Sequence, residues 1–270
     1  MRALPCVCAL AAGVAVAVAD TPIVLNATAE ATILDLFDDR AIGFGGVFAG
    51  TTNFGEVRRG LVRFDLSGLP DGEILTAELS VFIERLADGG PFDVGVHRLE
   101  TDWNEGPTPG GGQGGGVALP ATPADATWLV TGLGTSWGTP GGDFVATPTS
   151  VRTMAAPQDR VFFDVTADVQ AFRDGTPDFG WILVSQSEGV SQQIVKLSTD
   201  DSSLRPIELS VFIEPPNPAD LNGDGVLDIT DVDLFIVAFL GGDSAADLSE
   251  PFGIFDIDDI DAFIDAFLGP

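Results

Sequence analysis

The sequence has few of the residues that carry redox chemistry, nucleophilic catalysis or a positive surface. It contains no tyrosine, one histidine, two cysteines and 12 basic residues against 41 acidic ones. Both cysteines, Cys6 and Cys8, precede residue 20, so the remainder has no disulfide and no thiolate metal site. The histidine, His97, lies in a strand pattern without a nucleophile motif beside it, and no pattern singles out a carboxylate pair for glycoside hydrolysis. We therefore predict a protein that is not an enzyme.

Residues 1–19 have the pattern of a secretory signal peptide. Arg2 precedes an apolar run from Ala3 to Ala19, and the run ends in the small-x-small sequence "AVAD". The run is shorter than the roughly 20 residues of a membrane-spanning helix and is rich in alanine. We expect cleavage near Ala19, a secreted or cell-surface protein, and no membrane span in the mature chain.

The remaining chain is strongly acidic, and the acid is unevenly spread. Loss of residues 1–19 removes one basic residue, Arg2, and no acidic one, which leaves a net charge near −30. We expect no nucleic acid or anionic membrane as a partner, because the negative field repels both. No Lys or Arg follows Arg205, whereas Asp220 to Asp265 contains 13 acidic residues. Such a block repels itself into disorder unless cations neutralise it.

Residues 20–214 alternate apolar and polar residues in short runs separated by Gly, Pro, Asp and Ser. In "ILTAELSVFIERL" one face carries Leu75, Ala77, Leu79, Val81 and Ile83. The pattern recurs in "GLVRFDL", "FDVGVHRL", "RVFFDVTADV", "FGWILVS", "QQIVKLS" and "PIELSVFI". Many strands without intervening helices predict a mainly β fold, a jelly-roll-like antiparallel β-sandwich. The Gly-rich residues 107–128 are expected to form a flexible loop, and the Pro-rich residues 215–218 a linker.

The stretch "DLNGDGVLDITD" has the spacing of a 12-residue calcium loop. Positions 1, 3, 5, 7, 9 and 12 of such a loop supply oxygen ligands. Here they are Asp220, Asn222, Asp224, the backbone carbonyl of Val226, Asp228 and Asp231. Gly225 occupies the position of the sharp turn. A helical pattern follows, with Val232, Phe235, Ile236 and Phe239 on one face. Ca²⁺ is therefore the predicted cofactor.

The same segment then recurs in an altered form. Ile260, Phe263, Ile264 and Phe267 reproduce the apolar helix positions, so two helices are expected to pack face to face in a small all-α module, residues 219–270. The second loop keeps the ligand candidates Asp247, Ser249, Asp256 and Asp259, but "EPF" replaces the acid at position 5 and adds a residue. Two interpretations stay open: calcium binding, with Glu250 substituting, or a loop held by packing of Pro251 and Phe252.

Duplicated loop–helix segments with Asp at position 12 and no preceding helix resemble a type I dockerin, with a pair of EF-hand-like calcium loops. The "PFG" second loop resembles the variant called the GC-type dockerin. The resemblance covers residues 219–269 and implies a cohesin-like protein partner. In that family the partner surface includes loop positions 10 and 11, which here are Ile229, Thr230, Ile257 and Asp258.

The long domain resembles the DNRLRE family, also described as family 96 carbohydrate-binding modules. The matching pieces are "NFG", "GLVRFDLSGLPDG", "ILTAELSVFI", "VHRLETDWNEG", "FDVTADVQAFRDG", "FGWILVSQ" and "PIELSVFI". The resemblance implies a β-sandwich of a secreted protein and a polysaccharide as the partner, without naming the sugar.

Two groups of residues are candidates for binding a polysaccharide. Trp103, Trp128 and Trp137 lie at loop edges, where an aromatic face can meet a sugar ring; the alternative is that each caps the sandwich. Arg58, Arg59 and Arg63 form the one local concentration of positive charge. Arginine suits bidentate capture of carboxylates, so an acidic polysaccharide is possible; ion pairing with neighbouring acids is the alternative.

Taken together, these features predict a secreted, non-catalytic carbohydrate-binding and attachment protein with a calcium-binding, dockerin-like module. One alternative is a structural cell-surface or matrix protein that binds no sugar. A weaker alternative is a subunit of a polysaccharide-degrading system.

Overall fold

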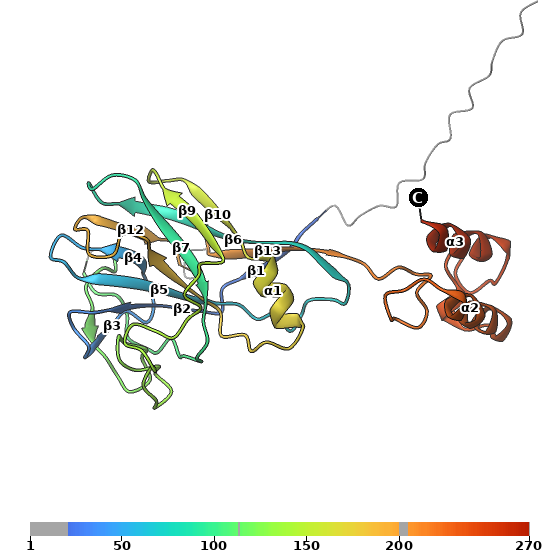
Figure 1. Ribbon diagram of the computed structural model, residues 1–270, viewed down its shortest axis with the longest axis horizontal. Helices are drawn as coiled ribbons and strands as arrows, with labels where there is room; N and C mark the ends of the chain where they lie inside the picture. The colour runs from blue at the N-terminus through green and yellow to red at the C-terminus, as the bar shows by residue number, and fades with distance from the viewer. Residues whose placement is uncertain (1–20, 113, 200–204, 270) are drawn as a thin grey trace, which may run out of the picture. The chain divides into compact units, whose positions relative to one another are not determined.

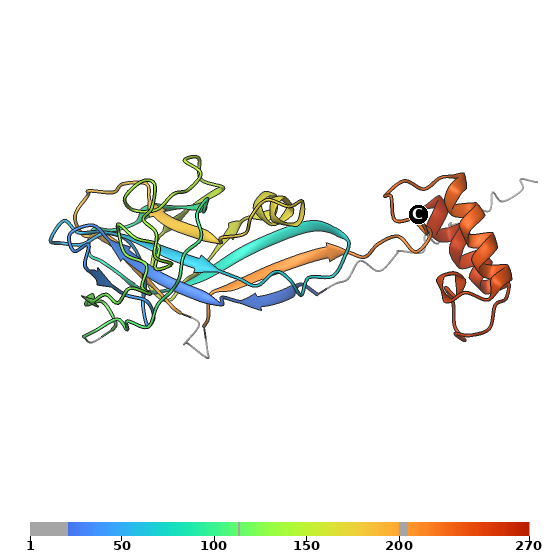
Figure 2. The same ribbon diagram turned by 90° about the horizontal axis from the view of Figure 1, so that it is seen from below.

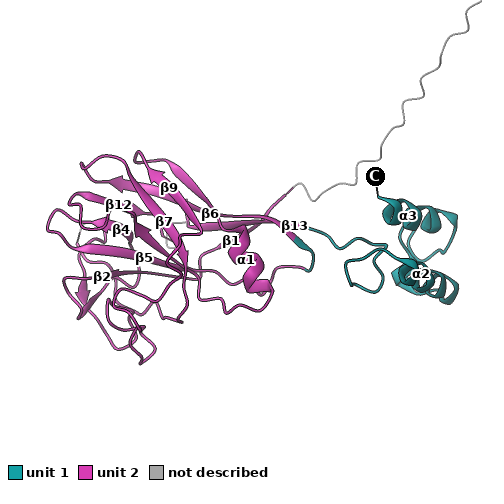
Figure 3. Cartoon of the chain, in the orientation of Figure 1, with its two compact units in different colours: residues 1–20, 71–73, 214–270 teal, residues 21–70, 74–213 magenta. Residues whose placement is uncertain are grey.

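The computed structural model of the chain describes residues 21–112, 114–199 and 205–269. The predicted signal peptide, residues 1–19, lies outside these ranges. The chain divides into two compact units: residues 21–70 and 74–213 form one, and the other begins at Glu214, with the short segment 71–73 grouped with it (Figure 3). Within the described ranges, no helix has the length and apolar character needed to cross a membrane.

Strands make up 34% of the structure and helices 15%, which confirms the predicted mainly β class. The strands of the first unit are β1 (Ile23–Asn26), β2 (Ala29–Leu34), β3 (Arg40–Ala41), β4 (Val47–Thr51), β5 (Val57–Arg63), β6 (Glu73–Leu86), β7 (Phe92–Arg98), β8 (Leu119–Pro120), β9 (Ser150–Met154), β10 (Arg160–Asp164), β11 (Trp181–Ser185), β12 (Gln193–Leu197) and β13 (Glu208–Glu214). One helix, α1 (Thr166–Arg173), lies among them.

All of these strands except β3 and β8, which pair with each other, form a curled, sandwich-like antiparallel sheet (Figures 1 and 2). Their order is β1-β13-β6-β12-β4-β5-β11-β7-β9, with β10 added to β6 and β2 added to β5. The long strand β6 makes this possible, because its residues 78–82 pair with β10 and its last residues pair with β12. One strand thus belongs to two parts of the sheet, and the sheet wraps around the main core.

The alternation predicted for β6 holds for most of its length. Ala77, Leu79, Val81 and Ile83 are fully buried in the main core. The expectation for Leu75 is wrong. Leu75 and Thr76 are both exposed, which interrupts the period of two, so Ile74 faces the core instead.

The segment "RVFFDVTADV" is only partly a strand. β10 ends at Asp164, whose side chain accepts hydrogen bonds from the backbone N–H and the hydroxyl of Thr166, and α1 begins there. Val169 and Phe172 of α1 are buried in the main core, and the Phe172 ring meets the Trp181 ring edge to face at 5.4 Å. In the sequence, Val165, Ala167 and Val169 continue the alternation of the strand, although the chain turns into α1 at Thr166.

The outer face of β2, β5 and β11 is apolar and lies beneath residues 100–149, drawn mainly in green in Figure 1. Ile33, Leu61 and Ile182 project from these strands into a second core, where they meet side chains of the covering segment. The prediction of a flexible loop at residues 107–128 is therefore wrong for the described part of that segment. Its backbone pairs with the domain through β8 and through bridges such as Phe44 to Pro109.

A buried carboxylate organises the covering segment. Asp125 accepts hydrogen bonds from the backbone N–H and hydroxyl groups of both Thr108 and Thr122, at 2.6–2.9 Å. Burial raises the pKa of Asp125, but the hydrogen bonds from the two threonines outweigh it, and the pKa lies below its ordinary value. Asp125 is therefore charged at neutral pH and holds two distant parts of the segment together.

The second unit contains α2 (Ile229–Gly241), the 3₁₀ turn η1 (Ser244–Ala246) and α3 (Ile257–Leu268). Asp228 and Asp256 cap the two helices in the same way, each within a capping box that Asp231 or Asp259 completes. The rings of Phe235 and Phe263 stack at 4.1 Å in the centre of the small core. Ile236 and Ile264, expected on the packed face, are exposed instead.

We predict that Asp125→Asn destabilises the sandwich by about 1–3 kcal/mol relative to Asp38→Asn, because one amide oxygen cannot accept all the threonine donors. Asp38 is exposed, so it controls for the loss of one negative charge. Urea unfolding measures the difference. Since the pKa of Asp125 is lowered on folding, the difference should be full above pH ~4 and should shrink as the pH falls through the lowered pKa. Equal stabilities of the two variants at neutral pH would contradict this role.

Candidate functional site

The three arginines of β5 are engaged within the protein. Arg59 forms a two-pronged ion pair with Glu188, with both distances 2.8 Å. Arg58 pairs with Glu56, and Arg63 pairs with Asp102 at 2.7 Å. Each guanidinium also lies over an aromatic ring: Arg58 over Phe48, Arg59 over Trp128 and Arg63 over Trp103. The structure thus favours ion pairing, the alternative that the sequence left open, over carboxylate capture by this cluster.

Two of the three candidate tryptophans are not available to a sugar. Trp103 and Trp137 are only 1% and 5% exposed, and they belong to the second core. Their indole N–H groups donate to the backbone carbonyls of Phe179 and Thr127, each at 2.9 Å. Both residues therefore cap the sandwich, and their assignment to a binding face is corrected. The sequence placed them at loop edges, whereas the loops themselves fold onto the sheet.

Trp128 is partly buried, and its ring carries the guanidinium of Arg59 at 4.7 Å. Trp181, by contrast, is in the main core, and its N–H donates to Asp168 at 2.8 Å. The four tryptophans therefore do not form a common face.

The surroundings of His97 also indicate a structural role. It is buried, its Nδ1 lies 2.8 Å from the carbonyl oxygen of Val145, and its ring meets Phe144 edge to face. Nε2 has no hydrogen-bond partner within the described part of the chain. Burial lowers the pKa of His97, so the side chain is neutral at neutral pH.

An open pocket of about 910 Å³ lies beside the turn that joins β4 to β5. Its apolar lining comes from Leu36, Phe37, Phe48, Phe54, Leu86 and Ile194. Phe54 is 84% exposed, more than any other large apolar side chain of the described residues. An aromatic ring held at the mouth of an apolar pocket is a typical feature of a ligand site.

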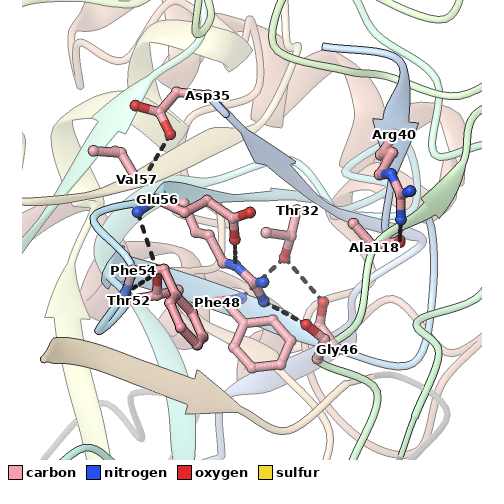
Figure 4. Close-up of polar contacts among 12 residues, drawn as sticks. Thr32, Asp35, Arg40, Gly46, Phe48, Thr52, Phe54, Glu56, Val57 and Ala118 are labelled. Atoms are coloured by element: carbon pink, nitrogen blue, oxygen red, sulfur yellow. Dashed lines mark hydrogen bonds and ion pairs between the residues drawn. The ribbon is translucent and has the colours of Figure 1, made fainter. Parts of the chain in front are cut away.

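Hydrogen bonds fix the turn that carries Phe54 (Figure 4). The Thr52 hydroxyl accepts from the backbone N–H groups of Phe54 and Glu56, and Thr52 N–H donates to the Glu56 carbonyl at 2.9 Å. Gly55 follows with a φ of +82°, which glycine adopts without strain. The short sequence "NFG" therefore presents an aromatic ring on a rigid support. Phe54 is not among the predicted sugar-binding residues, although an aromatic residue between Asn and Gly was a usable signal.

A buried ion pair forms one wall of the pocket. Arg58 forms an ion pair with Glu56 and also donates through Nη1 to the Gly116 carbonyl at 2.9 Å, so the β4–β5 turn is tied to the covering segment. Phe48 lies next to this pair, with its N–H bonded to Thr32 Oγ1 at 3.0 Å. The wall is therefore preorganised, and Arg58 contributes to its shape rather than offering free donors.

In the helical unit, the first predicted calcium loop has its carboxylates turned onto its own backbone. Asp220 accepts from the N–H groups of Gly223 and Gly225, each at 2.9 Å. Asp224 accepts from Val226 N–H, and the buried Asp231 accepts from Asn222 and Asp228 N–H. The hydrogen bond from Asp228, the largest influence, lowers the pKa of Asp231 below its ordinary value. Within the described ranges, no three acidic or histidine side chains converge as a metal site.

The second loop contains a carboxylate oxygen without a partner. Asp247 Oδ2 accepts from Gly253 N–H at 2.7 Å, whereas Oδ1 is buried and, among the described residues, unpaired. Asp259 is fully buried and accepts from the N–H groups of Leu248, Ser249 and Asp256. A buried, unpaired carboxylate oxygen is costly, and a hard cation is a suitable partner for it. The donor set therefore fits a metal of this kind.

The alternative of packing by Pro251 and Phe252 does not hold. Pro251 is exposed, and Phe252 is 67% exposed. These two residues therefore do not bury themselves to hold the loop.

The four candidate partner-binding residues, Ile229, Thr230, Ile257 and Asp258, are all exposed. The two isoleucines are 70% and 63% exposed and occupy equivalent places at the first turns of α2 and α3. Further exposed apolar residues also come in equivalent pairs: Val226 with Ile254, Ile236 with Ile264, and Leu240 with Leu268. The repeat thus presents the same apolar surface twice.

No protein-family model matches this chain, and no curated protein matches it.

We predict that Trp103→Ala lowers the free energy of unfolding by about 3–5 kcal/mol, because it leaves a cavity in the second core and an unpaired Phe179 carbonyl. Phe54→Ala should change it by about 0.5 kcal/mol or less, since the ring is exposed. Urea unfolding of both variants provides the comparison. A Trp103 variant as stable as the wild type would show that this residue does not support the core.

Proposed function

We propose that this is a secreted, non-catalytic attachment protein: a dockerin-like module stabilised by Ca²⁺ joins it to a cohesin-like partner, and its β-sandwich binds polysaccharide. The observation that carries the proposal is the buried Oδ1 of Asp247, which has no partner among the described residues and lies in a repeat of the first calcium-loop motif. The first loop offers the regular ligand spacing, and the second offers this oxygen for a cation.

The charge of the helical unit supports a need for cations. No basic residue follows Arg205, and the fully buried core is small: Ala219, Phe235, Ala246 and Phe263. Calcium would be held by Asp220, Asn222, Asp224, the Val226 carbonyl, Asp228 and Asp231 in the first loop. In the second loop it would be held by Asp247, Ser249, Asp256 and Asp259. The bound ions would neutralise part of the repulsion and order both helix N-termini.

The equivalent exposed pairs on α2 and α3 support the attachment role. Ile229 and Ile257, with Thr230 and Asp258 beside them, leave apolar groups in water that a partner would cover. The acidic surroundings favour a partner with basic residues around an apolar centre.

For the sandwich, Phe54 replaces the tryptophans as the proposed contact with a sugar ring. It is exposed, rigidly supported and close to polar groups of Asn53 and Gln192 in the same pocket. The sugar class, neutral or acidic, is left to experiment. The burial of Trp103 and Trp137 favours one competing function, a structural surface protein whose aromatic residues serve stability alone.

We predict that residues 217–270 are largely unfolded in chelator and become helical with calcium, because the acidic block lacks internal counterions. Asp247→Asn should weaken calcium binding by about tenfold or more, since it removes a ligand charge. Asp233→Asn, at an exposed position of α2, is the matched control and should bind normally. Circular dichroism and calorimetric titration measure the two effects. Helicity that persists in chelator would contradict the proposal.

We also predict that the chain is retained on insoluble or gel-embedded polysaccharides of one class, neutral or acidic, and that Phe54→Ala abolishes retention. Phe162→Ala removes another exposed phenylalanine, on β10, and should leave retention intact. Retention measured in calcium and in chelator distinguishes binding by the sandwich from binding by the helical unit. Failure on every class would favour the structural alternative.

A further inference from the structure

Within the described ranges, the pocket beside the β4–β5 turn contains one basic side chain that has no ion pair. Of its three basic lining residues, Arg58 pairs with Glu56, and Lys196 pairs with Glu84 at 2.5 Å. The side chain of Arg85, at the end of β6, has no hydrogen bond or ion pair within the described ranges. A free guanidinium next to an apolar wall is a suitable site for an anion, because it offers planar, two-pronged donation.

The backbone around Arg85 leaves room for its head group. A side chain at Gly114 would begin only 3.3 Å from Arg85 Nη1, and Gly116 also lines the pocket. The guanidinium therefore lies against bare backbone of the covering segment. Arg85 is exposed, so its donors remain accessible to a ligand.

The rest of the lining specifies the body of the ligand. Three phenylalanines, Phe37, Phe48 and Phe54, together with Leu36, Leu86 and Ile194, provide an apolar surface. The volume of about 910 Å³ is of the size that holds a small organic molecule. The one lining carboxylate without a partner within the described ranges, Asp88, is exposed. Its charge would repel an anion, but its side chain would not cover the apolar wall.

We propose that this pocket binds a small amphipathic acid, in which a carboxylate meets Arg85 and an aromatic or other apolar body packs on the phenylalanine wall. This ligand class is distinct from the polysaccharide proposed above, which would contact the exposed face of Phe54. The two proposals share the turn at the pocket mouth but differ in the group recognised.

The test is calorimetric titration of the full chain, in calcium, with three probes of similar shape: 2-naphthoate, 2-naphthamide and 2-naphthylmethylamine. The naphthoate should bind about tenfold or more tighter than the neutral amide, because only the acid makes a charge-assisted contact. Arg85→Gln should remove that preference. Arg152→Gln, at an exposed arginine of β9, is the matched control and should retain it. Leu36→Asn should weaken all apolar probes by reducing the apolar wall.

Asp88→Asn should change the affinity for naphthoate in the opposite direction. If the carboxylate of the ligand lies near Arg85, removing the Asp88 charge should strengthen naphthoate binding, because one repulsion is lost. A structural role for Arg85 alone would not produce this effect.

Three outcomes would overturn the inference: no saturable naphthoate binding up to about 10 mM, equal affinity for acid and amide, or an unchanged preference in Arg85→Gln. Binding of uronate oligosaccharides that depends on Arg85, without binding of naphthoate, would also overturn it and assign Arg85 to the polysaccharide. Conversely, naphthoate binding in a chain that no polysaccharide retains would support the pocket and reject the sugar-binding function. The two proposals can therefore fail separately.

Discussion

The need to cover the apolar outer face of the sheet determines most of the sandwich. Ile33, Leu61 and Ile182 point away from the main core, and residues 100–149 bury them in a second core. This cover must be ordered to exclude water, which explains why a glycine-rich segment is fixed by the buried Asp125 and by paired arginines. The cover uses Trp103 and Trp137 as its largest side chains, so these residues are lost as binding groups. The β4–β5 turn, which carries Phe54, lies where the covering segment leaves a pocket open.

In the helical unit the main constraint on folding is repulsion among acidic side chains rather than the need to bury an apolar face. Its helices are well formed locally, because aspartates cap both N-termini and glycine ends α2 in the left-handed conformation. Local signals of this kind do not remove the repulsion among 13 acidic residues. The same aspartates accept backbone N–H groups and, in our proposal, hold calcium. Helix capping and metal binding would therefore depend on one set of side chains.

The period of two identified the strands because each buries one face, and the spacing of "DLNGDGVLDITD" identified the first loop because its ligand positions are local. The errors have physical causes that a local pattern does not contain. The start of α1 has a strand pattern in the sequence, because Val165, Ala167 and Val169 continue the alternation of β10. Trp103 and Trp137 were placed at a binding face because nothing in their neighbourhood shows that residues 100–149 fold back onto β5. Ile236 was expected in the helical core, but the small contact between α2 and α3 leaves it in water.

The arginines show that a basic side chain without a partner identifies a candidate binding site better than a local concentration of positive charge does. In a chain with 41 acidic residues, a cation readily finds a carboxylate, and the cluster on β5 does so at each of its three arginines. An arginine without a partner is therefore an exception that the sequence cannot reveal, since pairing depends on residues as distant as Arg59 and Glu188. Within the described ranges, Arg85 is the one arginine whose side chain has neither an ion pair nor a hydrogen bond, and it lines the same pocket as Phe54, the most exposed aromatic ring of the sandwich. Because the exposed Arg85 side chain has no protein partner within the described ranges, an anion that also buries apolar area can bind its guanidinium without displacing one. Ion pairs and hydrogen bonds in the described part of the domain thus leave one arginine side chain where an external ligand has an advantage over the protein's own side chains.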